Sequence, residues 1–203
     1  MATTQDILAS RRARVVKLAH EQKRPLSRFQ RIFLEEPSHC TAHERSIEFA
    51  IKRSISDYFA VPYRSVVFTG SGHLGFSPHK GTLFDPRTSD LDVAIIDITL
   101  YQEYYELCIE HSRAFTDLTG YTYRGGAKSA NLLQEYIARK GMIPLWKMPS
   151  CETVLEDEAY LAGLGEKYRH VFAGISVVLF ISEYAFCWKQ ASAVKQLMAT
   201  YNV

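Results

Sequence analysis

Three short runs of apolar residues interrupt an otherwise mixed pattern of hydrophobic and polar positions. The runs cover residues 66–68, 93–96 and 170–182. They are rich in valine, isoleucine and phenylalanine, which predicts buried β-strands. Because the third run is almost continuously apolar, its strand is expected to be buried on both faces of a sheet.

Apolar residues at intervals of three and four predict helices before the first strand. Residues 4–22 carry a partial apolar stripe, and a second, short helix is expected to begin near Pro25 and to end before Pro37. Thr41 and Glu44 have the spacing of a capping box and predict the start of a third helix. Its expected buried face consists of Ile47, Ala50, Ile51, Ile55 and Phe59.

The second half of the chain adds further helical patterns around the third strand. A helix of roughly 15 to 20 residues is expected after the second strand and should close at Gly120. Another is expected over residues 128–140, stopped by Gly141. Residues 143–165 lose clear periodicity, which we interpret as a long loop with a short helix. A C-terminal helix is expected from about Glu183.

The composition is that of an ordinary globular protein. Of the 203 residues, 47% are hydrophobic and 23% are charged, which suits one sizeable core with a small helical addition. The net charge of +2 does not predict a general polyanion-binding surface. The four cysteines lie far apart without CxxC spacing, which predicts neither a disulfide scaffold nor a zinc site. With no apolar leader or long apolar window, we expect a cytoplasmic protein with reduced thiols and no membrane partner.

The residues that carry chemistry stand at the adjoining ends of the first two strands. Gly70, Ser71 and Gly72 follow the first strand, and a turn of this type directs N–H groups and a hydroxyl towards a ligand such as a triphosphate. Asp90 and Asp92 are two apart at the start of the second strand, so their side chains project to the same face. Two such carboxylates repel each other unless a cation lies between them, and hard oxygen ligands suit Mg²⁺ held jointly with substrate phosphates. A metal-nucleotide site is therefore predicted here.

These motifs carry a family resemblance. Gly70 and Ser71, followed by the run from Ser89 to Val93, resemble the signature of the nucleotidyltransferase superfamily that includes DNA polymerase β. That signature is a Gly-Ser or Gly-Gly turn followed by an Asp-x-Asp strand. The resemblance implies that Gly70 and Ser71 bind nucleotide phosphate.

The same resemblance implies a metal and a nucleotide. Asp90 and Asp92 would be the metal ligands, with Mg²⁺ as the expected ion and Mn²⁺ as the alternative. The partner would be an NTP, with ATP the expected one. Lys80 and Arg87 lie in the 18-residue segment over residues 72–89 and are candidates to neutralise the triphosphate. This segment could instead act as a lid.

The resemblance also implies the fold. The fold would be α+β, a nucleotidyltransferase-like mixed or antiparallel sheet flanked by helices. Its strands would cover residues 65–69, 91–96 and 171–181. Residues 1–40 would be an N-terminal helical extension, and residues 41–203 the nucleotidyltransferase-like domain.

One expected group is missing from the third strand. Many active members of this superfamily place a third carboxylate on a later strand, but residues 174–181 contain no acid. Ser176 stands roughly where the carboxylate is expected, and Glu183, just past the strand, is the nearest substitute. A protein that binds nucleotide but has reduced catalysis is therefore a serious alternative.

Three functions remain open from the sequence. The first is Mg²⁺-dependent transfer of a nucleoside monophosphate from an NTP to a hydroxyl group of a protein, an RNA or a small molecule. The second is an accessory or regulatory subunit with reduced catalysis, a role that the resemblance associates with bacterial toxin–antitoxin and phage-defence systems. The third is RNA binding, which requires a set of basic residues to gather on one face. That set comprises Arg11, Arg12, Arg14, Arg124 and Lys128.

Overall fold

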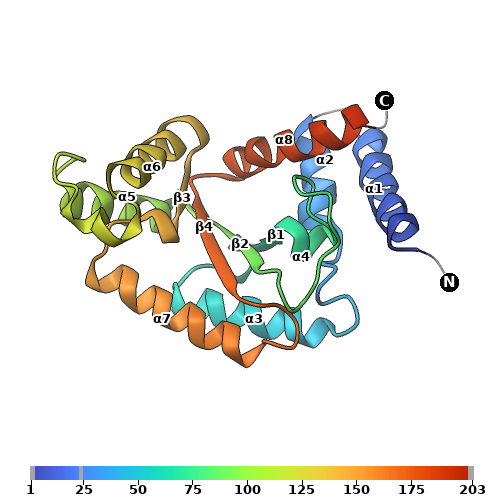
Figure 1. Ribbon diagram of the computed structural model, residues 1–203, viewed down its shortest axis with the longest axis horizontal. Coiled ribbons are helices and arrows are strands. Elements are labelled where there is room, and N and C mark those ends of the chain that lie inside the picture. The colour runs from blue at the N-terminus through green and yellow to red at the C-terminus, as the bar shows by residue number, and fades with distance from the viewer. Residues whose placement is uncertain (1–2, 23–24, 201–203) are drawn as a thin grey trace.

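The computed structural model describes residues 3–22 and 25–200 and has a mixed four-stranded sheet at its centre (Figure 1). The strand order is β1-β2-β4-β3. β1 runs antiparallel to β2, β2 parallel to β4, and β4 antiparallel to β3. The strands are β1 (Val66–Thr69), β2 (Leu91–Ile96), β3 (Met142–Pro144) and β4 (Ile175–Phe180). An α+β fold with a mixed sheet flanked by helices is thus confirmed.

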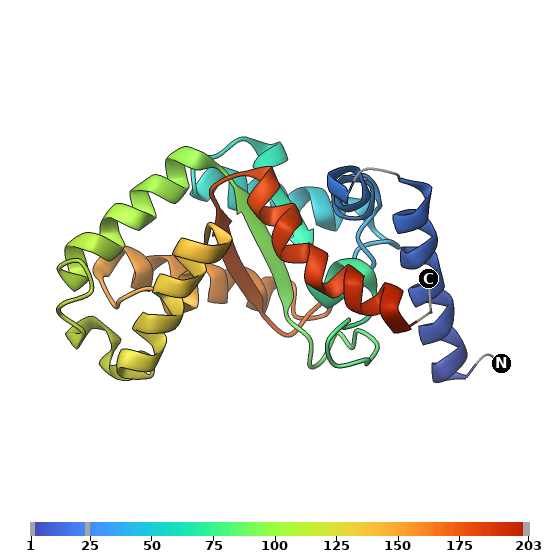
Figure 2. The same cartoon turned by 90° about the horizontal axis from the view of Figure 1, so that it is seen from above.

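Helices cover both faces of the sheet (Figures 1 and 2). They are α1 (Thr4–Glu21), α2 (Pro25–Gln30), α3 (Arg45–Tyr58), α4 (Gly70–Leu74), α5 (Ile98–Ser112), α6 (Gly126–Lys140), α7 (Glu152–Lys167) and α8 (Glu183–Thr200). Shorter turns of π or 3₁₀ helix are η1 (Arg31–Glu35), η2 (Tyr63–Ser65), η3 (Thr119–Arg124) and η4 (Leu145–Lys147). α3, α5 and α7 contribute to the core on one face, and α1, η1 and α8 to the core on the other.

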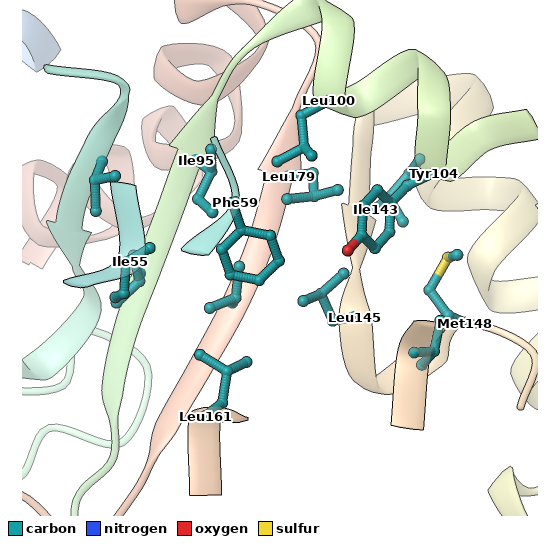
Figure 3. Packing of buried hydrophobic residues seen from close by; sticks show 14 of the residues in the cluster. Ile55, Phe59, Ile95, Leu100, Tyr104, Ile143, Leu145, Met148, Leu161 and Leu179 are labelled. Carbon is teal, nitrogen blue, oxygen red and sulfur yellow. The ribbon is translucent and has the colours of Figure 1, made fainter. Parts of the chain in front are cut away.

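The larger core lies between the sheet and α3, α5 and α7 (Figure 3). Ile55 of α3, Ile95 of β2 and Leu179 of β4 are completely buried in it. Alternate strand residues point to opposite faces, so Val93 joins Ile95 in this core while Ala94 faces the other side. Complete burial of each large aliphatic side chain contributes about 1.5–3 kcal/mol to folding.

The smaller core joins the N-terminal helices to the sheet. Val15 of α1 and Ile32 of η1 pack in one cluster with Val67 of β1 and Phe186 of α8. Arg11 of α1 also donates a hydrogen bond of 2.5 Å to a loop carbonyl beyond α4. The helices that the sequence assigned to an extension are therefore part of the packing that holds α8 on the sheet.

The expected loop over residues 143–165 is wrong, because most of this segment is β3 and the 16-residue helix α7. The buried face of α7 includes Val154, Leu161 and Leu164, at helical spacing, but Asp157 also lies on it. The hydroxyl of Tyr104 donates a 2.5 Å hydrogen bond to Asp157, which compensates for burying the carboxylate. Asp157 thus interrupts the apolar pattern by which the sequence would have predicted this helix.

Three expected element boundaries are also wrong. α5 ends at Ser112 and not at Gly120. The Ser112 hydroxyl donates a hydrogen bond to the Cys108 carbonyl and accepts one from the Phe115 N–H, which closes the helix there. The predicted Thr41 capping box is absent: α3 begins at Arg45, and the Thr41 hydroxyl donates to Glu48 inside the helix. β4 begins only at Ile175, since the apolar residues just before it form a turn that packs in the core.

Candidate functional site

Asp92 lies at the centre of the candidate site, between two neighbouring strands. In the sheet register it is opposite Thr69 of β1 on one side and Ser176 of β4 on the other. The Ser176 hydroxyl donates a hydrogen bond of 2.8 Å to Asp92 Oδ1. A Cβ atom at Gly70 would lie 1.9 Å from Asp92 Oδ2, so only glycine leaves room for this carboxylate. Gly70 also has φ +63°, a conformation that glycine adopts without strain.

Asp90 is exposed and lies close to a second glycine. A Cβ atom at Gly174 would lie 3.0 Å from Asp90 Oδ1. Leu91, between the two carboxylates, is completely buried, and its N–H donates to the Gly174 carbonyl. Leu91 thus packs in the core at the strand position between the two carboxylates.

The electrostatics of Asp92 reflect this crowding. Burial raises the pKa of Asp92, the Ser176 hydrogen bond lowers it, and the charge of Asp90 raises it again. The positive charges of Lys189 and Lys80 lower it, but the pKa remains above its ordinary value. An ionised Asp92 is therefore costly in the protein alone, and a bound cation would offset that cost.

Asp92 belongs to the lining of two cavities. A cleft of about 720 Å³ lies on the α7 side and is lined by Asp90, Asp92, Ser176 and residues of α7. A smaller cavity of about 250 Å³ lies on the α8 side, and its lining includes Gly70, Asp92 and Lys189. The side chains of Asp92 and Trp146 line both cavities.

The pair of carboxylates fits a hard cation that is shared with a substrate. Asp92 Oδ1 is occupied by Ser176, and Oδ2 lies in the space that the absent side chain of Gly70 leaves open. Among residues 3–22 and 25–200, no group of three His, Cys, Asp or Glu side chains could hold a metal ion. Mg²⁺ suits such a site because it is commonly bound by one or two carboxylates together with substrate phosphates and waters.

β4, the strand on which a third carboxylate was expected, carries none. Ser176 occupies the register position beside Asp92, as the sequence suggested. Glu183, the nearest substitute in sequence, lies past the far end of β4 and accepts a hydrogen bond of 2.6 Å from Gln30. It is therefore not placed at the carboxylate pair.

The segment before β2 brings few of its candidate residues to the site. Gly70 and Ser71 begin the short helix α4 where an open turn was expected, and Ser71 lines neither cavity. Lys80 is exposed but close enough to lower the pKa of Asp92. The Arg87 side chain is 88% exposed and forms an ion pair with Asp85 at 3.3 Å.

The histidines of this segment differ in their roles. His73 is buried, and its Nε2 donates a hydrogen bond of 2.7 Å to the Ile32 carbonyl. Burial also lowers the pKa of His73, so it is a neutral structural residue. His79 instead lines the smaller cavity, which Asp92 also lines.

Sequence reasoning missed three residues of the site, all of them late in the chain. Gly174 supports Asp90, Lys189 lines the smaller cavity, and Gln190 donates a hydrogen bond of 2.9 Å to the Thr69 hydroxyl. A polar pair, Lys189 and Gln190, within the apolar pattern of the C-terminal helix was the only sequence signal for the last two.

Comparison with known proteins identifies no family for this chain. No family model, curated protein or solved structure matches this chain. None of the described helices has the length and apolar character that crossing a membrane needs. The interpretation of the site therefore depends on its own geometry and on the resemblance of its two motifs.

Proposed function

We propose that this protein binds an NTP with Mg²⁺ at Asp90 and Asp92 and transfers its nucleoside monophosphate to a hydroxyl acceptor. The observation that carries the proposal is the position of Asp92. Its carboxylate is fixed between Gly70 and Ser176 and lines two cavities at once. A transferase needs such a point, where two substrates can meet over one charged group.

The chemistry can be stated in terms of bonds. The acceptor oxygen forms a bond to the α-phosphorus. The bond from that phosphorus to the oxygen bridging the α- and β-phosphates breaks, and pyrophosphate leaves. The proton of the acceptor hydroxyl goes to solvent. Asp90 and Asp92 would hold Mg²⁺, which would neutralise the charge of the phosphates.

The remaining site residues position this pair of carboxylates. Ser176 orients Asp92 through its hydrogen bond, and Leu91 fixes the strand between the two carboxylates in the core. Gly70 and Gly174 leave the space in which the carboxylates lie. In this proposal ATP is the expected donor, and the backbone at Gly70 contacts its phosphates.

Labelled NTPs test the proposal directly. The protein is incubated with each α-labelled NTP and Mg²⁺, alone and with protein, RNA and small-molecule acceptors. Transfer of label is expected from the wild-type protein and should be abolished by Asp90→Asn combined with Asp92→Asn. Asp85→Asn is the matched control, because Asp85 is a partly exposed carboxylate that pairs with Arg87 and lines neither cavity.

Calorimetric titration with Mg²⁺ and a non-hydrolysable NTP separates binding from transfer. Absence of any nucleotide binding by the wild-type protein would overturn the proposal. Binding without transfer to any acceptor would instead support the second candidate function.

That second candidate is a nucleotide-binding accessory or regulatory subunit with reduced catalysis. The observation that favours it is Ser176, which occupies the register position beside Asp92 where a third carboxylate was expected. In that case the Asp90→Asn and Asp92→Asn variant should keep partner binding and biological activity. A bacterial toxin–antitoxin or phage-defence system is the setting to examine first.

The arrangement does not favour a single basic RNA-binding face. α1 and the start of α6 lie at opposite ends of the sheet (Figures 1 and 2). Arg14 of α1 pairs with Glu36. Arg124 donates two hydrogen bonds to Glu158, at 2.7 and 2.8 Å. These guanidinium groups are thus already paired with carboxylates of the protein.

A further inference from the structure

Another cavity lies between the N-terminal helices and α4, and neither Asp90 nor Asp92 lines it. Its volume is about 220 Å³. Its wall is built from α1, η1, α4 and the segment that joins η1 to α3. The apolar part of this wall consists of Val15, Leu18, Ile32, Pro37, Ala42 and Leu74.

The polar part of the wall carries more positive than negative charge. Two arginines, Arg11 and Arg14, and one acid, Glu36, belong to it. Both oxygens of Glu36 are occupied, Oε2 by Arg14 at 2.5 Å and Oε1 by Arg31 at 3.1 Å. The charge of Glu36 is therefore neutralised by its own partners. Within residues 3–22 and 25–200, no carboxylate forms an ion pair with Arg11, which donates instead to a backbone carbonyl.

Arg11 and His39 lie against the same glycine at the end of α4. A Cβ atom at Gly75 would lie 3.0 Å from Arg11 Nη1 and 2.8 Å from His39 Cγ. Arg11 gives one N–H to the Gly75 carbonyl, and its guanidinium group carries further donors. Among the described residues, none forms a hydrogen bond with the His39 imidazole, which packs at 83° to the ring of Phe84. Both side chains therefore have donors to spare.

The protein itself does not compensate the burial of these two groups. Burial lowers the pKa of Arg11. Burial also lowers the pKa of His39, and the charges of Arg11 and His43 lower it further. A partly buried cation without a carboxylate partner is costly, and a bound anion would offset that cost.

We propose that this cavity binds a small organic monocarboxylate, with its carboxylate at Arg11 and His39 and its apolar body against the aliphatic wall. One uncompensated cation matches one negative charge, whereas a doubly charged phosphate would also lie near Glu36. An apolar cavity of about 150 Å³ holds benzene. The volume of about 220 Å³ therefore leaves room for a ring with one carboxylate. This site goes beyond the proposed function and does not depend on it.

A ligand in this cavity would also hold α1 against α4. The N–H groups of His39 and Cys40 donate to carbonyls of α4 at 3.0 and 2.8 Å. Arg11 donates to Gly75, the residue that ends the same helix. A carboxylate that bridges Arg11 and His39 is therefore expected to slow amide hydrogen exchange at His39, Cys40 and Gly75.

Benzoate is the probe for this site, and heteronuclear NMR locates its binding. The wild-type protein should bind benzoate saturably, with a dissociation constant of about 1 mM or lower. The shifted amides should fall in the segments that line the cavity, at residues 11–18, 36–42 and 73–75. Arg11→Met should weaken binding at least about tenfold, because it removes a charged hydrogen-bond donor. Arg11→Lys should keep most of the affinity.

Lys17→Met is the matched control. Lys17 lies on the same helix, is exposed and does not line the cavity, so its substitution should leave benzoate binding unchanged. Benzyl alcohol, an uncharged analogue, and inorganic phosphate test the charge and the class of the ligand, and both should bind more weakly than benzoate. Ala42→Phe, at an exposed position of the wall, narrows the cavity and replaces Arg11→Met if that variant does not fold by circular dichroism.

Each outcome decides a part of the inference. Absence of saturable benzoate binding, or shifts centred on the cleft beside Asp90 and Asp92, would overturn the site. Tighter binding of phosphate or benzyl alcohol than of benzoate would overturn the carboxylate assignment. Equal affinities in Arg11→Met and Lys17→Met would overturn the role of Arg11. None of these measurements uses a nucleotide or Mg²⁺, so the proposed function stands or falls separately.

Discussion

Gly70→Ala tests whether the carboxylate at the centre of the site requires a glycine beside it. Alanine at this position meets two costs. One is the left-handed backbone conformation at φ +63°, which costs an alanine about 1–2 kcal/mol. The other is the Cβ atom, which would lie 1.9 Å from Asp92 Oδ2 and must displace that carboxylate.

Gly126→Ala is a control that carries only the first cost. Gly126 has φ +58°, and a Cβ atom there would have no neighbour within 4 Å. Both substitutions reduce the conformational entropy of the unfolded chain equally, so this effect cancels in their difference. We expect Gly126→Ala to lower the free energy of unfolding by about 1 kcal/mol, since that entropy offsets part of the strain.

Gly70→Ala should lower the free energy of unfolding by about 2–4 kcal/mol, because moving Asp92 also breaks its hydrogen bond to Ser176. Urea unfolding followed by far-ultraviolet circular dichroism measures the difference between the two variants. Adding Asp92→Ala to Gly70→Ala should recover about 1–2 kcal/mol, because the collision is then absent. A loss for Gly70→Ala no larger than that for Gly126→Ala would refute the close contact.

Three further outcomes follow from the structure. Burial raises the pKa of Asp92, so its ionisation opposes folding. The Asp92→Asn variant should therefore gain stability relative to the wild-type protein as the pH rises above about 3.9. A difference in unfolding free energy that stays constant between about pH 3 and 7 would contradict this. Arg124→Met should lower the free energy of unfolding by about 1–3 kcal/mol, and much less in a Glu158→Gln background, as a double-mutant cycle in urea would show. Ile95→Ala should lower the free energy of unfolding by about 2–5 kcal/mol in the same assay, because Ile95 of β2 is completely buried in the larger core. A loss below about 1 kcal/mol would contradict that packing.

Local patterns predicted the central strands and most helices. The apolar run at residues 93–96 lies in β2, and the stop at Gly141 is the observed end of α6, because these signals depend only on neighbouring residues. α7 was missed because Asp157 interrupts its apolar face, and the partner that makes this acceptable, Tyr104, belongs to another helix. A sequence pattern does not contain that pairing.

The same distinction explains what was found of the site. Asp90 and Asp92 were identified because they are neighbours on one strand, and their spacing alone places them on one face. Gly174 and Lys189 were not, because their proximity to the carboxylates depends on how β4 and α8 pack against β2. Arg87 was expected to neutralise the triphosphate, but its side chain forms an ion pair with Asp85, two residues away in the sequence.

The contact between Ser176 and Asp92 joins residues 84 positions apart along the chain. β2 has no neighbour on that side until β4 has been made, so a nascent chain that contains only the two motifs presents Asp92 on an open strand edge. Closing such a long loop is entropically slow, and parallel pairing of this kind is among the later events in folding. The order of synthesis thus keeps the carboxylates from being assembled into a pocket until most of the protein exists.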